Sequence, residues 1–403
     1  MVSIMSWILL VVGGWWFSRC KNSTLRRILI VAYILRVALV IEHHFFLPLL
    51  GSQADAQTFV RIATTWANKG PLYLLTHVGM NAWLYVWGLA WMFYFFGSSF
   101  FLAQTINVLL GVGAVKLVYQ ASSMLWGMER GRRAAWVAAL FPTLLLYSAI
   151  PMRESLLIFS ALWGIVGWLR WYMQDGKNWR ALGQALFGFL LSAGLHTAMF
   201  FGGGLMFLLS MAFLTTRRLK RWRISKTILY TDLLIGMVGL ITVATGWGLG
   251  YIAASKKYAS VLVWLQRHLT FAARGGAAYL SGFVPQTWWD IVWMTPIRML
   301  YFLCMPFPWM LHRPQELLGS FNGWIWCLLF LWLFKKSSLI WKREITRILL
   351  FGFLGLWFTL AWGVSNYGTS IRHSIKLLPF ILVLLPFPKI RFKTCAVSES
   401  KSE

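Results

Sequence analysis

A lone aspartate stands at the edge of a long apolar run. Asp55, in GSQADAQTFVRIATTWANKG (51–70), is the only carboxylate between Glu42 and Glu129. An aspartate directly before a helix caps its N-terminus and interacts favourably with the positive end of the helix dipole. A carboxylate in a fixed orientation can also act as a general base. Asp55 is therefore interpreted as a helix cap, a catalytic base, or both.

Two further turns between apolar segments carry ionisable side chains. Arg153 and Glu154 lie in LLLYSAIPMRESLLIF, and His196 lies in LLSAGLHTAMFFGGG. Charged groups at membrane depth are costly and usually face water or a partner. Arg153 and Glu154 either form a local ion pair or line a cavity, where Glu154 is a catalytic candidate and Arg153 a substrate ligand. His196 is either an interhelical hydrogen-bonding residue or a substrate ligand.

The late stretch SNYGTSIRHSIK (365–376) brings Arg372, His373 and Lys376 to the end of a predicted helix. Its polar residues disfavour a lipid-facing helix. An anionic partner such as a diphosphate would account for three cations at this place. TPIRMLYFLCMPFPWMLHRP (295–314) contributes Arg298 as another candidate ligand, because its prolines favour a broken helix beside an aqueous cavity.

Neither histidines nor cysteines show a metal-binding pattern. His43 and His44 are adjacent, so on a helix their rings diverge by about 100°. The cysteines are scattered without a CxxC pair: Cys20, Cys304, Cys327 and Cys395. We predict no metal-ligand set, although a divalent metal stays possible, and no disulfide framework.

These residues are embedded in a strongly apolar chain. Of 403 residues, 59% are hydrophobic and 12% are charged, with mean hydropathy +0.65. Soluble domains average about 25% charged residues. Because apolar runs of about 20 residues recur throughout, we predict an all-α polytopic membrane protein. Residues 1–393 would form one membrane domain, followed by a disordered cytoplasmic tail at 394–403.

The chain carries 38 Lys and Arg against 11 Asp and Glu. The cations cluster in short loops, which is the positive-inside pattern and does not favour nucleic-acid binding. The clusters are 19–27, 130–133, 170–180, 217–226, 335–347 and 389–393. Apolar segments are predicted at 2–17, 27–50, 79–96, 99–119, 134–150, 154–173, 181–195, 198–215, 226–251, 290–311, 318–334, 346–364 and 377–389.

Placing every basic cluster inside conflicts with strict alternation of all these segments. Re-entrant or interfacial segments within 79–119 and 290–334 resolve the conflict, so we expect about 11–13 transmembrane helices. The outer face then collects a first loop at 51–77, a long loop at 252–293, and the turns with Glu154, His196 and Arg372. Because unpaired charges near lipid have no structural benefit, we expect Asp55 and Arg372 within about 15 Å of each other.

An acid in the first outer loop, followed by IATTWANKGPLYLL and then GRRAAWVAALFPTLLLYSAIPMRESLL, resembles the integral-membrane GT-C glycosyltransferases. The resemblance spans roughly residues 27–220. The late PFPW and NYGTSIRHSIK stretches resemble bacterial exopolysaccharide and O-antigen polymerase-like proteins.

The resemblance implies a polyprenyl-(di)phosphate-linked sugar donor, a glycan or lipid acceptor, and a site on the outer face of a bacterial inner membrane. Asp55 would be the base, while Arg153, Arg372 and Lys376 would stabilise the departing phosphate. Three alternatives remain open: a repeat-unit polymerase, a transporter of lipid-linked glycans, and a scaffold. Membrane lipids are expected partners in each case.

Overall fold

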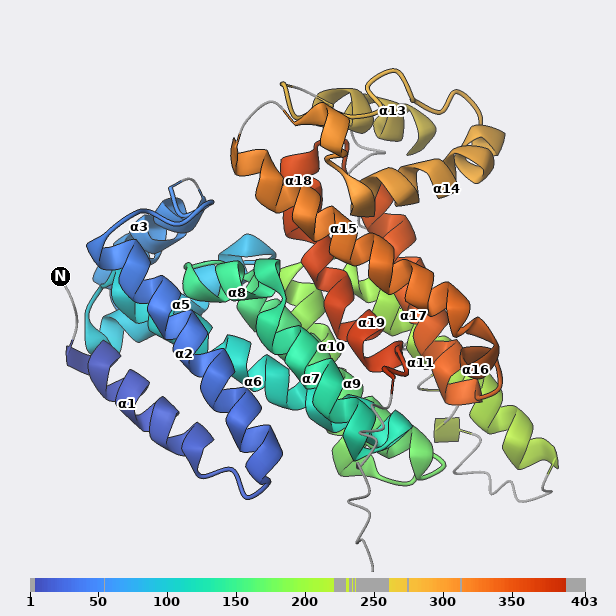
Figure 1. The fold of residues 1–403 in the computed structure, drawn as a ribbon, viewed down its shortest axis with the longest axis horizontal. Coiled ribbons are helices and arrows are strands. Elements are labelled where there is room, and N and C mark those ends of the chain that lie inside the picture. Colours follow the sequence, from blue (N-terminus) through green and yellow to red (C-terminus); the bar gives the residue numbers. More distant parts are fainter. Residues whose placement is uncertain are drawn as a thin grey trace, which may run out of the picture.

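The computed structural model of this protein describes residues 4–53, 55–220, 230, 231, 234, 236, 261–273, 275–311 and 314–388. Within these residues the chain is helical, apart from turns, loops and one isolated bridge between Ala278 and Asn366 (Figure 1). The predicted all-α architecture is confirmed. The tail at 394–403 and most of the segment predicted at 226–251 lie outside the described residues.

The helices follow one another along the chain in this order: α1 (Ile4–Ser18), α2 (Ser23–Phe45), α3 (Asp55–Asn68), α4 (Pro71–Thr76), α5 (Ala82–Phe96), α6 (Phe100–Trp126), α7 (Met128–Leu140), α8 (Pro142–Ala149), α9 (Glu154–Met173), α10 (Trp179–Leu195), α11 (Met199–Lys220), α13 (Val261–Ala272), α14 (Trp288–Cys304), η1 (Pro308–Met310), α15 (Pro314–Lys335), α16 (Ser337–Trp341), α17 (Glu344–Trp362), α18 (Tyr367–Ser374), η2 (Ile375–Leu377) and α19 (Leu378–Leu384).

Five of the described helices are long and apolar enough to cross a membrane: α6, α9, α11, α15 and α17. The described helices α1 and α5 are also apolar but shorter. This chain is therefore a polytopic membrane protein. The total of 11–13 transmembrane helices stays a prediction, because some predicted segments are divided between shorter helices.

Among the predicted segments whose bounds differ from the observed helices, two have an identifiable reason. The segment predicted at 134–150 is split between α7 and α8, since Phe141 is extended and Pro142 begins the next helix. Proline disfavours helical geometry in the residue before it. In contrast, α6 continues past the predicted end at residue 119 to Trp126, and Gly127 with φ of 87° then ends it. The small polar residues after 119 are accommodated because Ala121 and Ser122 are buried against neighbouring helices.

The break predicted within residues 295–314 is confirmed, whereas the aqueous cavity expected beside it stays a prediction. α14 contains Pro296 and ends at Cys304, and a cis peptide bond between Met305 and Pro306 leads into η1. In Figure 1, α13 and α14 lie across the upper ends of α15 and α17. The α14 helix is not among the described helices that qualify as membrane spans.

Cys304 and Cys327 form a disulfide between α14 and α15, with their Cα atoms 6.2 Å apart. The sequence predicted no disulfide framework and did not anticipate this single pair. A Cβ on Gly323 would lie 2.6 Å from the Cys304 carbonyl oxygen. The absence of a side chain at Gly323 lets α15 approach the end of α14, and Cys327 follows one helical turn later.

Close contact between α9 and α10 depends on glycine in the same way. A Cβ on Gly188 would lie 2.5 Å from the Gly164 nitrogen and 2.7 Å from the Ser160 carbonyl oxygen. Small residues at such interfaces allow the backbones of membrane helices to approach closely. This packing holds α9, whose first residue is Glu154.

Gly188→Ala is expected to lower the free energy of unfolding by about 1–3 kcal/mol, because rigid backbone must move to admit the methyl group. Gly183 lies on the same helix, and a Cβ there would meet no neighbouring atom within 4 Å. Gly183→Ala should therefore be neutral or slightly stabilising. Unfolding midpoints of both purified variants in detergent would test the difference, and equal midpoints would contradict it.

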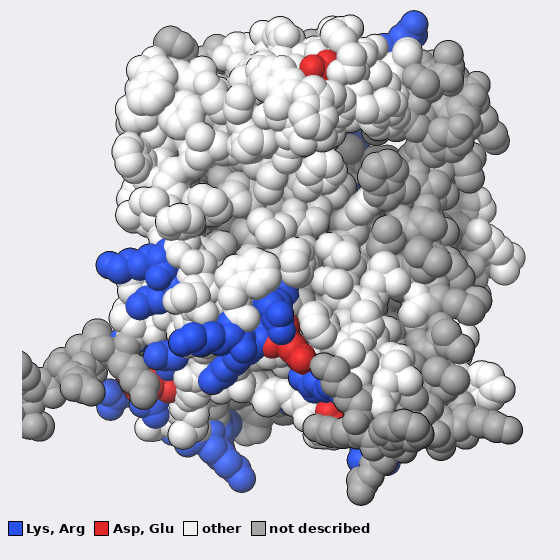
Figure 2. Space-filling view, turned by 90° about the vertical axis from the view of Figure 1, so that its right-hand side faces the viewer, with Lys and Arg blue, Asp and Glu red and all other residues white. Residues whose placement is uncertain are grey.

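The basic loops meet at one end of the bundle. Arg217 pairs with Glu344 and lies 3.4 Å from Asp175, and Arg343 donates to the Leu125 carbonyl at 2.7 Å. Figure 2 shows most visible Lys and Arg gathered towards the lower end of the molecule, whereas α13, α14 and α18 lie at the upper end in Figure 1. The positive-inside rule predicts that the lower end is cytoplasmic and that the upper end, called the outer end below, faces outside. This sidedness stays a prediction.

Candidate functional site

Arg372 joins three helices at the outer end of the bundle. Its Nε donates to Glu154 Oε1 at 2.8 Å, and its NH1 group pairs with the carboxylate of Asp55. The two carboxylates come from α9 and α3, and Arg372 lies in the last turn of α18. The predicted proximity of Asp55 and Arg372 is confirmed, since the two side chains are in contact.

Glu154 is the buried centre of this cluster. Its side chain is 0% exposed, and Oε1 lies 3.7 Å from Lys376 Nζ and 3.9 Å from Arg153 Nε. As the first residue of α9, its charge also interacts favourably with the helix dipole. The pair predicted between Arg153 and Glu154 exists, but Arg372 is the closer partner of Glu154.

The cluster carries more positive than negative charge. Arg153, Arg372 and Lys376 oppose Asp55 and Glu154, so three cations against two carboxylates leave one positive charge. In addition, Glu154 Oε2, Lys376 Nζ and Arg153 Nε are buried and make no hydrogen bond within the described structure. Buried polar groups normally have such partners. An anion that also carries a hydroxyl group would accept hydrogen bonds from Lys376 Nζ and Arg153 Nε and donate one to Glu154 Oε2.

The cluster opens to the exterior at Asp55. The Asp55 side chain is 52% exposed and that of Arg372 is 18% exposed, whereas Glu154 and Lys376 are fully buried. The helix that carries Asp55, α3, is amphipathic and buries Phe59 and Ala63 against α5. Asp55 therefore lies at the entrance and Glu154 at the bottom of the cluster.

A capped helix and a short backbone ladder fix the position of Arg372. The Asn366 side chain accepts from the Gly368 and Thr369 nitrogens at 3.0 and 3.3 Å, so it caps α18. Tyr279 N donates to Ser365 O at 3.0 Å, and Tyr367 N donates to Ala277 O at 2.9 Å. The long outer loop thus holds the start of α18, and Arg372 lies in the last turn of α18, where the helix dipole favours a positive charge.

His196 and His373 lie side by side next to these charges. Their ring centroids are 5.0 Å apart in an edge-to-face arrangement. Arg153 NH1 donates to the carbonyl of Leu195, the neighbour of His196, at 3.0 Å. Burial and the positive charge of Lys376 lower the pKa of both histidines well below the ordinary value. Burial by itself would lower the pKa of Arg372. The carboxylates of Glu154 and Asp55 have the larger combined effect, so the pKa of Arg372 is raised.

The lowered histidine pKa values predict acid sensitivity. Each histidine binds fewer protons in the folded protein than in the unfolded chain, so stability should fall as pH drops below about 6.5, the unfolded value. The loss is at most about 1.4 kcal/mol per pH unit for each histidine. His196→Gln should flatten this pH dependence, as followed by the unfolding midpoint between pH 7 and 5. His77→Gln, at an exposed position, should not, and parallel curves for wild type and His196→Gln would contradict the prediction.

Arg298 belongs to a neighbouring network. It donates to Ser365 Oγ at 2.7 Å and to the Phe283 carbonyl at 3.1 Å, and its guanidinium lies 4.9 Å from the Trp362 ring centroid. Ser365 precedes the Asn366 cap, so Arg298 supports the start of α18. Its predicted contact with substrate stays a prediction.

Two residues that the sequence did not single out also belong near this end. Tyr147, on α8, accepts a hydrogen bond at its backbone carbonyl from Ser155 Oγ at 3.0 Å, next to Glu154. Arg36 is fully buried in α2 and donates to Ser148 Oγ at 2.8 Å and to the Ala32 carbonyl at 2.9 Å. Both stand in apolar runs where helical periodicity marks core positions. The signal available for Arg36 was a charge inside a predicted span.

No family model, curated protein or solved structure matches this chain. The site is therefore interpreted from its own geometry. Within the described residues there is no group of three or more His, Cys, Asp or Glu side chains placed to hold a metal ion. What the cluster offers is one exposed carboxylate, one buried carboxylate and three cations at the outer end of a membrane protein.

Proposed function

We propose that this protein is a membrane glycosyltransferase that moves a sugar from a polyprenyl-(di)phosphate carrier to a glycan or lipid acceptor. The supporting observation is the bridge that Arg372 makes between Asp55 and Glu154. It places a half-exposed carboxylate beside a partly buried cation cluster with one excess positive charge. We place the reaction at the outer face of a bacterial inner membrane, in keeping with the GT-C resemblance and the basic loops at the other end.

The residues match the two requirements of the reaction. The acceptor hydroxyl transfers its proton to the Asp55 carboxylate while its oxygen forms a bond to the anomeric carbon of the sugar. The bond from that carbon to the phosphate oxygen breaks, and its electron pair leaves with the polyprenyl phosphate. Arg372, Arg153 and Lys376 stabilise the charge that develops there. Glu154 holds Arg372 in place, and its free Oε2 accepts from a sugar hydroxyl.

The direct test is product formation by the purified protein. Protein in detergent would be incubated with polyprenyl-phosphate-linked and polyprenyl-diphosphate-linked sugars and candidate glycan or lipid acceptors, and products followed by mass spectrometry. A covalent product that depends on the donor, with release of the polyprenyl carrier, is the expected result. Movement of an unchanged donor across proteoliposomes without any product would instead establish a transporter.

A repeat-unit polymerase is the second candidate. The deep placement of Lys376 and Glu154 favours it, because a diphosphate would reach Arg372 of α18 and Lys376 of η2 while Asp55 stays at the entrance. A polymerase that relies on these cations would tolerate Asp55→Asn and lose activity with Lys376→Gln. Products in ladders of whole repeat units would identify this activity.

A further inference from the structure

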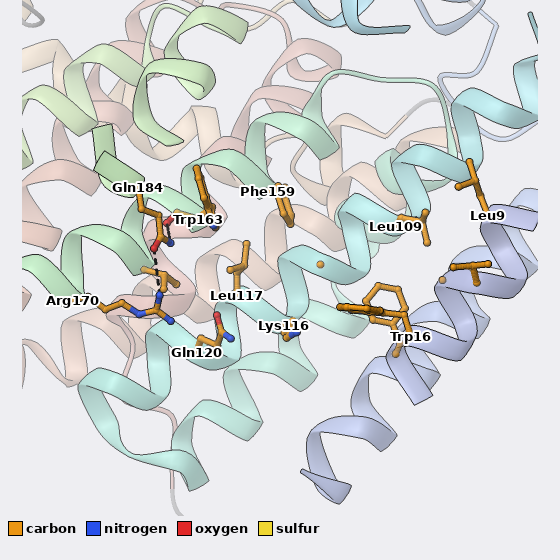
Figure 3. A pocket seen from close by; sticks show the side chains of 15 residues that line it. Leu9, Trp16, Leu109, Lys116, Leu117, Gln120, Phe159, Trp163, Arg170 and Gln184 are labelled. Carbon is orange, nitrogen blue, oxygen red and sulfur yellow. Dashed lines mark hydrogen bonds between the residues drawn. The ribbon is translucent and has the colours of Figure 1, made fainter. Parts of the chain in front are cut away.

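A second ligand-binding feature lies on another part of the protein, in a groove between α1, α6 and α9 (Figure 3). α6 packs against both α1 and α9 and forms the floor. The groove has a volume of about 460 Å³, within the range of small-molecule sites. Its walls are mainly apolar, with Trp16 and Leu109 on one side and Phe159 on the other.

Polar side chains gather at one part of this groove. Figure 3 shows Lys116, Gln120, Arg170 and Gln184 on its left and lower sides, away from Leu9 and Leu109. Arg170 NH1 donates to Gln184 Oε1 at 3.3 Å, and Gln184 donates to the Trp163 carbonyl at 2.8 Å. Lys116 lies on α6 and makes no hydrogen bond or ion pair with another described residue. Among the described residues that line the groove, two are cations and none is acidic.

The cations lie towards the end of the bundle that carries the basic loops, which the positive-inside rule predicts to be cytoplasmic. Arg170 lies three residues before Met173, the last residue of α9, which is about 5 Å along the helix axis. Lys116 lies ten residues before Trp126, the last residue of α6, which is about 15 Å. A lysine at that depth extends its amine towards the interface. Glu154 begins α9 at its opposite end, so this groove is separate from the cluster around Arg372.

We propose that this groove binds one anionic glycerophospholipid from the cytoplasmic leaflet. The phosphate lies between Lys116 and Arg170, where Gln120 and Gln184 offer further hydrogen bonds. One acyl chain follows the apolar wall past Leu109 and Phe159. We choose an anionic lipid because its net negative charge would neutralise part of the positive charge of Lys116 and Arg170. A zwitterionic lipid carries no net charge and would neutralise less of it. The proposal does not depend on the reaction at Asp55.

The test is lipid binding to the full-length protein by native mass spectrometry, with phosphatidylglycerol and phosphatidylcholine of identical acyl chains. An anionic surface attracts each nearby Lys or Arg by an amount equivalent to about fivefold in binding. Lys116→Gln with Arg170→Gln should weaken phosphatidylglycerol binding roughly 25-fold. Phosphatidylcholine binding should weaken less, because its choline group already compensates the phosphate charge. The control is Lys177→Gln with Arg180→Gln, which removes the same charge at exposed positions outside the groove.

A second variant keeps both cations. Val12 lines the groove and is 53% exposed, so Val12→Trp should fill the space and weaken binding of phosphatidylglycerol. Unfolding midpoints would show whether each variant is folded. The proposal is overturned if the Lys177 and Arg180 control weakens phosphatidylglycerol binding as much as the Lys116 and Arg170 variant. It is also overturned if Val12→Trp binds this lipid normally. A third contrary result would be that the groove variants lose bound polyprenyl phosphate and keep phosphatidylglycerol.

Discussion

Arg372→Gln is expected to reduce sugar transfer by at least about 10²-fold, the usual effect of removing one donor that stabilises transition-state charge. The same substitution leaves the fully buried Glu154 with Lys376 at 3.7 Å as its nearest cation. Breaking a buried ion pair lowers the free energy of unfolding by about 3–5 kcal/mol. We expect a loss near the lower value, because Lys376 still compensates part of the Glu154 charge. Both activity and stability should therefore fall, as measured by product formation and by the unfolding midpoint.

Two further variants separate the loss of activity from the loss of stability. Arg372→Lys keeps a cation beside the buried Glu154, so this variant should recover stability. It should not recover activity, because a lysine does not reproduce the guanidinium that bridges both carboxylates. Arg61→Gln removes an exposed arginine from α3, the helix that carries Asp55, and should change neither. Full activity of Arg372→Gln would refute the assignment of the phosphate site.

Asp55→Asn is expected to lower transfer by about 10²–10⁴-fold, because an amide cannot accept the proton of the acceptor hydroxyl. Donor binding should persist, since the three cations remain. The effect on stability should stay below about 1 kcal/mol, because the pair with Arg372 is half-exposed on the Asp55 side. Initial rates and donor affinity measured on the same preparation would show a loss in rate with little change in binding.

The matched control is Asp290→Asn, which makes the same change in an exposed carboxylate that begins α14 on the outer side. Asp290 accepts from the Gln286 and Thr287 nitrogens at 2.9 and 2.8 Å, so its role is to cap a helix. Its substitution should leave transfer unchanged. An Asp55→Asn variant as active as the control would exclude the general-base mechanism and leave the polymerase as the better proposal.

The amino-acid sequence alone determined the class of protein and the choice of candidate residues. Apolar runs and basic loops depend only on local composition, so they predicted a polytopic helical protein and its sidedness. Asp55, Glu154 and Arg372 stood out because charges are rare between apolar runs. Their convergence could be expected, since outer loops of one bundle share one end.

Only the tertiary structure decided which partners these residues have. Arg372 and Glu154 are separated by 218 positions, and no periodicity encodes which helix end meets which. The disulfide between Cys304 and Cys327 and the placement of Arg298 beside Ser365 likewise depend on how α14, α15 and α18 pack. Lys116 and Arg170 appeared as ordinary helix cations until α1, α6 and α9 enclosed one groove. Local sequence sets what each helix is, but the close approach of helices at small residues such as Gly188 and Gly323 sets which side chains meet.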